Sequence, residues 1–427
     1  MLSLASSFSL TYLTGSSGVA LRTFLTFAIV TYALTRPAER AFYCLLAILP
    51  FQNVLKITHE IPIVPSILMV LIILKLLLRR PRLSHYLILI MISLFSIAFV
   101  NFEGTPITTL LGWFSIFLLI ALLLGRYDSG YIPIDLNSTV LALSMGFAVS
   151  SVVSLLFPGI VLNAGIFKES LYYVIDRQLT RFQGFFGDPN YYSQGMLFSS
   201  SILLYSVAYS RSLFARVSKI LAALFMLLIG YSSLSKMFLL FSIVPLVQLI
   251  AIIVNRRKEL IRLILNISGF LLFALIIVGI AYFYVFTFPV LRDAFVQRLD
   301  IGLTTGRFDS QFIYLSKALS DPVLTLFGVG IGYQMLDKIN ATAPHNSYIE
   351  FYFSIGIVGI VLLLLFYIEV LVVARRRRIY KSRLDINLIF PISCLLLTAL
   401  SLDAVKLDLF YFYWFIVTYV AVKEERT

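Results

Sequence analysis

The chain has 427 residues, of which 60% are hydrophobic and 13% charged. Soluble domains are about half apolar and about a quarter charged, so this composition excludes an ordinary water-soluble protein. A bilayer accommodates it, because a spanning helix needs roughly 20 apolar residues and closes its backbone hydrogen bonds internally. The formal net charge is +13. The Lys and Arg residues stand in short runs between apolar stretches and form no continuous basic face, so we expect a lipid bilayer and no nucleic acid as a partner.

The apolar stretches, taken in chain order, predict an all-α fold, a polytopic transmembrane helical bundle. They lie at about 18–35, 41–57, 61–78, 84–100, 105–125, 136–157, 189–209, 218–235, 236–254, 262–288, 346–374, 386–402 and 404–422. This pattern gives about 13 crossings, with a range of about 12 to 14 because several stretches are short or abut one another. Charged residues are nearly absent from the centres of these predicted spans, with Lys75 as the exception. Ion-coupled transporters usually carry ionisable groups at the midplane, so that mechanism is disfavoured.

The basic residues alternate from loop to loop, and this bias sets the orientation. Most Lys and Arg fall in loops that would share one side, which we take as cytoplasmic together with the C-terminus; these loops contain Arg36, Arg40, Arg79, Arg80, Arg82, Arg126, Arg211, Arg216, Lys219, Arg256, Arg257, Lys258, Arg262, Arg375 to Arg378, Lys381, Arg383, Lys423 and Arg426. Two longer loops, at about 158–188 and 289–345, would then be external. The longer one contains helix-like pieces such as 309–319, which predicts a partly helical external loop cap.

The chain therefore divides into five segments. Residues 1–157 are N-terminal transmembrane helices, and 158–188 are an external loop with Arg181. Residues 189–288 are central transmembrane helices, 289–345 are the long external loop with Arg307 and His345, and 346–427 are C-terminal transmembrane helices.

His345 stands where the long external loop meets the next span, between Pro344 and Asn346. Pro344 marks a boundary, and Asn346 is a plausible helix cap. One interpretation is a capping turn whose histidine lies at the level of the lipid headgroups. The other is a neutral imidazole that serves as a general base near neutral pH. Glu350, one helical turn later, could orient or pair with His345.

Basic residues in the two external loops suggest an anion site. Arg177 and Arg181 precede a span that starts at Asp188-Pro189-Asn190, and Arg307 follows Thr305-Gly306. Guanidinium is the preferred planar ligand for phosphate, and helix N-termini add backbone donors. Asp188-Pro189-Asn190 and Pro344-His345-Asn346 occupy equivalent places at the start of inward-going spans. Lys236, after a serine-rich external turn, could add a cation to the same surface.

Several site classes are not indicated by the sequence. It contains no Walker loop, no metal-ligand constellation and no Gly-x-Ser-x-Gly elbow. Cys44 and Cys394 both lie in apolar stretches and match no metal-ligand spacing,. We therefore expect no metal site and no cofactor.

The ordered set of motifs resembles the O-antigen ligase and O-antigen polymerase superfamily of bacterial polysaccharide membrane glycosyltransferases. The resemblance covers roughly 180–360 and rests on these motifs: Arg181-x-x-Gly184, Gly187-Asp188-Pro189-Asn190, Ser232 to Lys236, Thr305-Gly306-Arg307, Gly328-x-Gly330-x-Gly332, Pro344-His345-Asn346-Ser347-Tyr348 and Gly356-x-x-Gly359. The family often has Ser where Thr305 stands and Arg where Lys236 stands.

The resemblance implies a metal-independent inverting glycosyltransferase that uses a polyprenyl-diphosphate-linked donor at the periplasmic face of the bacterial cytoplasmic (inner) membrane. Arg181 and Arg307 would bind the diphosphate and stabilise the leaving group, and His345 would deprotonate or orient the acceptor hydroxyl. Arg177, Asp188, Asn190, Lys236, Asn346 and Glu350 are the further candidates for substrate binding.

The leading hypothesis is a polymerase that joins lipid-linked oligosaccharide repeat units into a surface polysaccharide (O-antigen, capsule or exopolysaccharide). Its partners would be the glycan donor, a glycan acceptor, the bilayer, and flippase and chain-length regulator proteins. A ligase that transfers the glycan to lipid A core or another acceptor shares the donor site, so the sequence does not separate the two. A lipid-linked oligosaccharide flippase or exporter would need a cationic cavity through the membrane. A purely structural membrane protein leaves the external Arg and His residues unexplained.

Overall fold

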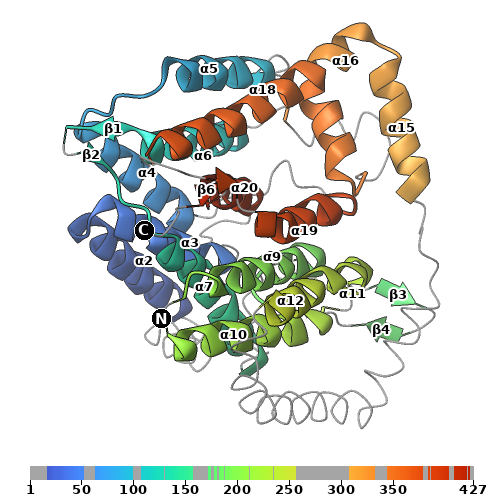
Figure 1. The fold of residues 1–427 in the computed structure, drawn as a ribbon. Helices are drawn as coiled ribbons and strands as arrows, with labels where there is room; N and C mark the ends of the chain where they lie inside the picture. Colours follow the sequence, from blue (N-terminus) through green and yellow to red (C-terminus); the bar gives the residue numbers. More distant parts are fainter. Residues whose placement is uncertain are drawn as a thin grey trace.

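The computed structural model is built almost entirely from helices (Figure 1). It describes residues 17–51, 63–99, 107–128, 130–156, 172–174, 177–179, 182–186, 188–210, 212–233, 235–255, 307–331, 344–377, 383–384, 386–402, 408–420 and 422–423. The helices are α2 (Ser17–Thr35), α3 (Ala38–Ile48), α4 (Ile63–Leu78), α5 (His85–Phe99), α6 (Ile107–Leu124), α7 (Leu136–Leu156), α9 (Pro189–Val207), α10 (Leu213–Tyr231), α11 (Lys236–Phe241), α12 (Ile243–Asn255), α15 (Arg307–Leu319), α16 (Pro322–Phe327), α18 (Ser347–Arg377), α19 (Ile389–Ala399) and α20 (Asp408–Val420).

Short antiparallel pairs and 3-10 turns complete the described part. The strands are β1 (Arg126–Tyr127) with β2 (Gly130–Tyr131), β3 (Tyr172–Val174) with β4 (Arg177–Leu179), and β5 (Arg383–Leu384) with β6 (Val422–Lys423). The 3-10 turns are η1 (Leu49–Phe51) and η3 (Ile386–Leu388). The all-α class is thus confirmed, since the strands in the described part are only two or three residues long.

Every predicted apolar stretch within the described residues contains a helix, and the predicted span at 262–288 lies outside them. Four helical stretches are long and apolar enough to cross a membrane: Leu136–Ser154, Leu213–Tyr231, Lys236–Ile253 and Ser347–Arg376. Six shorter apolar helices accompany them in the described part. The predicted helix at 309–319 is confirmed as α15, which begins two residues earlier.

The helices have two distinct ends, with β1 and β2 at the left and β3, β4 and α15 at the right in Figure 1. At the β1–β2 end, the backbone N–H of Arg82 donates to the Arg126 carbonyl at 2.7 Å, and Arg126 returns the bond at 3.1 Å. In the β5–β6 pair, Arg383 lies opposite Lys423. Basic loops that the charge bias assigns to one side are therefore joined by backbone hydrogen bonds.

Lys75 was expected at the centre of a span, and this expectation is wrong. It lies in the last turn of α4. Its Nζ donates to the carbonyl oxygens of Leu34 at 2.7 Å and Arg36 at 2.6 Å, at the C-terminal end of α2. The final carbonyls of a helix lack partners within the helix and carry partial negative charge, so the ammonium caps α2 from a neighbouring helix.

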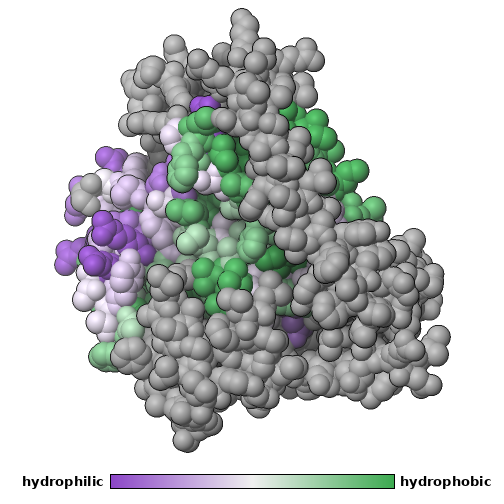
Figure 2. All heavy atoms as spheres, turned by 90° about the horizontal axis from the view of Figure 1, so that it is seen from below, coloured by the Kyte–Doolittle hydropathy of each residue, from purple (hydrophilic) through white to green (hydrophobic). Residues whose placement is uncertain are grey.

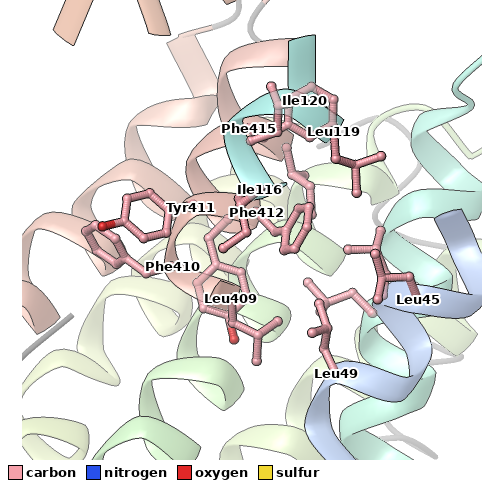
Figure 3. Packing of buried hydrophobic residues seen from close by; sticks show 14 of the residues in the cluster. Leu45, Leu49, Ile116, Leu119, Ile120, Leu409, Phe410, Tyr411, Phe412 and Phe415 are labelled. Atoms are coloured by element: carbon pink, nitrogen blue, oxygen red, sulfur yellow. The ribbon is translucent and has the colours of Figure 1, made fainter. Parts of the chain in front are cut away.

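Aromatic and aliphatic side chains from α3, α6 and α20 fill the interior (Figure 3). Trp113 on α6 donates its indole N–H to the hydroxyl of Tyr411 on α20 at 2.7 Å, so both polar atoms of this buried aromatic pair are satisfied. The rings of Phe117 and Phe366 meet edge-on, with centroids 4.9 Å apart.

Apolar side chains are also exposed on the surface. Figure 2 shows hydrophobic residues open on one face and a hydrophilic group at its edge. On α12, Ile243 and Ile250 are 61% and 59% exposed. Exposed apolar area on this scale is unusual for a soluble monomer and suits contact with lipid.

Candidate functional site

The loop before α9 ends in a side-chain cap. Oδ1 of Asp188 accepts hydrogen bonds from the backbone N–H groups of Asn190 at 2.6 Å and Tyr191 at 3.2 Å, and Pro189 takes the first helical position. A carboxylate here satisfies helix donors that have no other partner and complements the positive end of the helix dipole. This cap accounts structurally for Asp188, which had been proposed as a substrate-binding residue.

The serine-rich turn before α11 is fastened to the start of α9. Phe182 donates its N–H to the Ser232 carbonyl at 3.3 Å, and the Ser235 hydroxyl donates to Oδ1 of Asn190 at 3.0 Å. Lys236 begins α11, so its backbone lies next to the residue that contacts Asn190. Arg181 lies outside the described residues, but its chain neighbour Phe182 belongs to this cluster.

Gly184 makes this arrangement possible. Its φ is +54°, in the left-handed region that favours glycine,. A Cβ at this position would overlap with the ring of Tyr192, one turn into α9. The tight turn lets Phe185 and Phe186 reach the interior, where Phe185 stacks on Phe51 with centroids 5.6 Å apart.

The start of α18 repeats the pattern at α9. Oδ1 of Asn346 accepts a hydrogen bond from the N–H of Tyr348 at 3.0 Å, which confirms the predicted helix cap. His345 precedes the cap with a φ of +48°, an uncommon value for a residue with a side chain,. Glu350 lies in the first turn, where its charge complements the helix dipole,. Strained backbone of this kind often marks a functional position.

The last turn of α19 stands between these two helix starts. Gln194 of α9 donates to the hydroxyl of Thr398 at 2.9 Å. The Ser347 hydroxyl of α18 donates to the Leu402 carbonyl at 2.6 Å, about one helical turn further along the chain,. The structure thus places Asn190 and His345 at the same end of the helices, on either side of α19.

The helix that begins with Arg307 is tied to the residue before His345. Nε2 of Gln311 on α15 donates to the Pro344 carbonyl at 3.1 Å. Arg307 lies four residues earlier, so its backbone is on the same helix face one turn away. The side chain of Arg307 lies outside the described residues, as does that of Arg177, whose backbone pairs with Val174 in the β3–β4 hairpin.

A backbone junction holds α15 and α16 against α18. The N–H groups of Val329 and Gly330 donate to the carbonyls of Phe353 at 2.9 Å and Ser354 at 2.8 Å. These carbonyls need outside partners because α18 is broken at Gly356, whose φ of +63° is not helical,. A Cβ at Gly328 would overlap with the Ser354 carbonyl group, so the two backbones approach too closely for any other residue.

We predict that Gly328→Ala destabilises the protein by more than about 2 kcal/mol, since strain at a φ of +73° adds to the collision with Ser354 backbone,. Thermal unfolding in detergent measures the change. Gly112→Ala on α6 is the matched control, because a Cβ there meets nothing within 4 Å. Equal unfolding temperatures for the two variants would show that the junction contributes little.

Hydrogen bonds link the starts of α9 and α18 to the end of α19, and α15 to the turn before α18. At the N-termini of α9 and α18, the N–H groups of Asn190, Tyr191 and Tyr348 are bound to the capping side chains of Asp188 and Asn346. His345 and the first residue of α15 stand within a few residues of the Gln311–Pro344 contact. Within the described ranges, no three His, Cys, Asp or Glu side chains gather into a metal-binding group.

The residues that link these helix starts to one another have no signal in the charge pattern of the sequence. Gln194, Ser235 and Gln311 are uncharged, so nothing in the charge pattern singles them out. The sequence does indicate one feature of Gln311: it follows Arg307 by one helical turn, so the two residues share a helix face. The glycines at 328, 330 and 356 were noted as motifs, and the structure gives them a packing role.

Comparison with known proteins provides no assignment. No protein-family model, no curated protein and no solved structure matches the chain.

Proposed function

We propose that the protein is a multi-pass bacterial membrane glycosyltransferase that polymerises polyprenyl-diphosphate-linked oligosaccharide repeat units into a surface polysaccharide. It would cross the cytoplasmic membrane about 12 to 14 times, and its β3–β4 end would face the periplasm. The sequence resemblance to O-antigen polymerases and ligases motivates the substrate class.

One observation carries the proposal. Gln311 of α15 donates to the carbonyl of Pro344, which ties the helix that begins with Arg307 to the turn that bears His345. The same end of the molecule holds the capped start of α9 and, through Ser235 and Asn190, the start of α11. A basic residue can stabilise a departing diphosphate, and an imidazole can take the proton of an attacking hydroxyl.

The proposed reaction forms a bond from the acceptor hydroxyl oxygen to the anomeric carbon of the donor. The bond between that carbon and the diphosphate oxygen breaks, with inversion at the carbon. His345 takes the proton of the attacking hydroxyl, and the leaving polyprenyl diphosphate departs as an anion. Arg181 and Arg307 stabilise the negative charge that develops on the diphosphate.

The β1–β2 end supports the orientation. Several basic residues make contacts outside the proposed site. The Lys75 ammonium caps α2, the backbones of Arg82 and Arg126 pair with each other, and so do those of Arg383 and Lys423. Lys and Arg residues in the loops at one end of apolar helices are typical of the cytoplasmic side.

Incubation of the purified protein with undecaprenyl-diphosphate repeat units tests the function. A polymerase makes longer glycans from these units alone, with chelator present or absent. A ligase makes no product until a second acceptor is added. Unchanged repeat units under both conditions would contradict transferase activity.

A further inference from the structure

Helix α15 carries an exposed apolar stripe that its packing does not use. One face of the helix, with Tyr314 and Ala318, is buried against Phe353 of α18. A second face presents Phe312, Leu315 and Leu319, which recur at intervals of three and four residues and therefore align. Phe312 is 72% exposed and Leu319 60% exposed.

The remaining face of α15 is mixed, with Ile313 41% exposed among polar side chains. Lys317 and Ser320 are exposed there, and Lys317 lies about 140° around the helix from Phe312. The helix has 13 residues, which at about 1.5 Å each is too short to cross a bilayer of about 30 Å,. A continuous apolar stripe on a short helix that also exposes polar side chains is typical of a helix that lies in the plane of a membrane surface.

The apolar surface continues from α15 onto α16 and then onto α18. On α16, Val323, Leu326 and Phe327 are exposed. The backbone of Leu326 is packed directly on Gly356. The next residue, Ile357, begins an exposed stripe along α18 that runs through Val361, Leu364 and Ile368.

The α18 stripe belongs to a helix that is long and apolar enough to cross a membrane, so its exposed side chains fit acyl chains. Helix α16 lies beside α18 (Figure 1), near Gly356 and the start of this stripe. A bilayer that covers the α18 stripe therefore also reaches α16 and α15. A protein partner would have to cover a surface that is continuous with the lipid-facing one.

We infer that α15 and α16 form an in-plane cap that docks its stripe of Phe312, Leu315, Leu319, Val323, Leu326 and Phe327 into the acyl-chain boundary of the bilayer. The occupant of this surface is the membrane itself. Arg307 and the Gln311–Pro344 contact are then held at the level of the lipid headgroups, where the diphosphate of a lipid-linked substrate resides. The inference rests on the membrane placement within the proposed function.

The test uses the full chain in lipid vesicles, with Cys44 and Cys394 replaced by Ala. Single cysteines at Phe312, Lys317 and Val361 are labelled with an environment-sensitive fluorophore. Quenching by phospholipids that carry a nitroxide on the acyl chain is then measured. Lys317→Cys is the matched control on the remaining face of the same helix, and Val361→Cys reports on the span.

We expect quenching at Phe312→Cys to resemble that at Val361→Cys and to exceed that at Lys317→Cys by at least about twofold. Strong quenching at 361 with none at 312 overturns the inference and leaves the proposed function standing. A blue-shifted but unquenched label at 312 shows a protein on this surface and also overturns it. No quenching at either position contradicts the membrane placement itself.

Discussion

Replacing His345 by Asn is expected to reduce glycan transfer by about 10²- to 10⁴-fold, the usual contribution of a positioned general base. Asn tolerates the left-handed conformation that His345 adopts at a φ of +48°, so the turn before α18 is retained. The substitution therefore removes the imidazole without disturbing the Asn346 cap. Product formation per unit time from lipid-linked repeat units measures the loss.

A second histidine provides the control. His85 is the first residue of α5 and follows the loop of Arg82, at the β1–β2 end. His85→Asn should leave transfer within about twofold of the original, because it removes an imidazole far from the proposed donor site. If His345→Asn retained the same activity as His85→Asn, His345 would not be the base, and the interpretation as an interfacial capping turn would hold.

Arg307→Ala is expected to lower kcat for transfer by about 10²- to 10³-fold, because the role we propose for Arg307 is to stabilise the departing diphosphate with a fixed positive charge. Ala is a strong helix former, so α15 should still begin at this residue. The KM for the donor should rise as well. Arg307→Lys should recover part of the rate, because a point charge replaces a planar group that binds phosphate through two hydrogen bonds.

Lys317→Ala controls for the loss of a cation from the same helix. Lys317 is exposed in the last turn of α15, and its removal should leave kcat unchanged. Similar losses in both variants would indicate a general charge effect on the cap, and Arg307 would then have no special role at the diphosphate.

The helices were predictable because their signal is local. A run of apolar side chains with turn and charge signals at its ends is sufficient to place a helix within a few residues, as at α7 and α9. The Asn346 cap was predictable for the same reason, since a capping side chain acts on N–H groups two and three residues ahead.

Contacts between distant parts of the chain were not predictable in this way. The break at Gly356 depends on Val329 and Gly330, which supply the hydrogen bonds that the broken helix lacks. Lys75 looks like an isolated charge until the end of α2 is placed beside it. In each case the determining partner is more than 20 residues away, and a single sequence carries no signal for that pairing.

The candidate site was predicted in part. The sequence placed His345, Asn346, Asp188 and Asn190 at two helix starts, and the structure brings those starts to one end of the molecule. The roles of His345, Arg181 and Arg307 in transfer stay predictions. The joining residues Gln194 and Gln311 could be identified only from the fold.

Photolabelling tests the central claim, a single diphosphate site at the β3–β4 end, most directly. A polyprenyl diphosphate with a photoreactive group in its first isoprene unit is activated in membranes that contain the protein, and the modified peptides are mapped. We predict labels within 182–190 and within 307–311 or 344–350, competed away by unlabelled polyprenyl diphosphate. Labels confined to the β1–β2 end, at 126–137 or 212–219, would contradict the account.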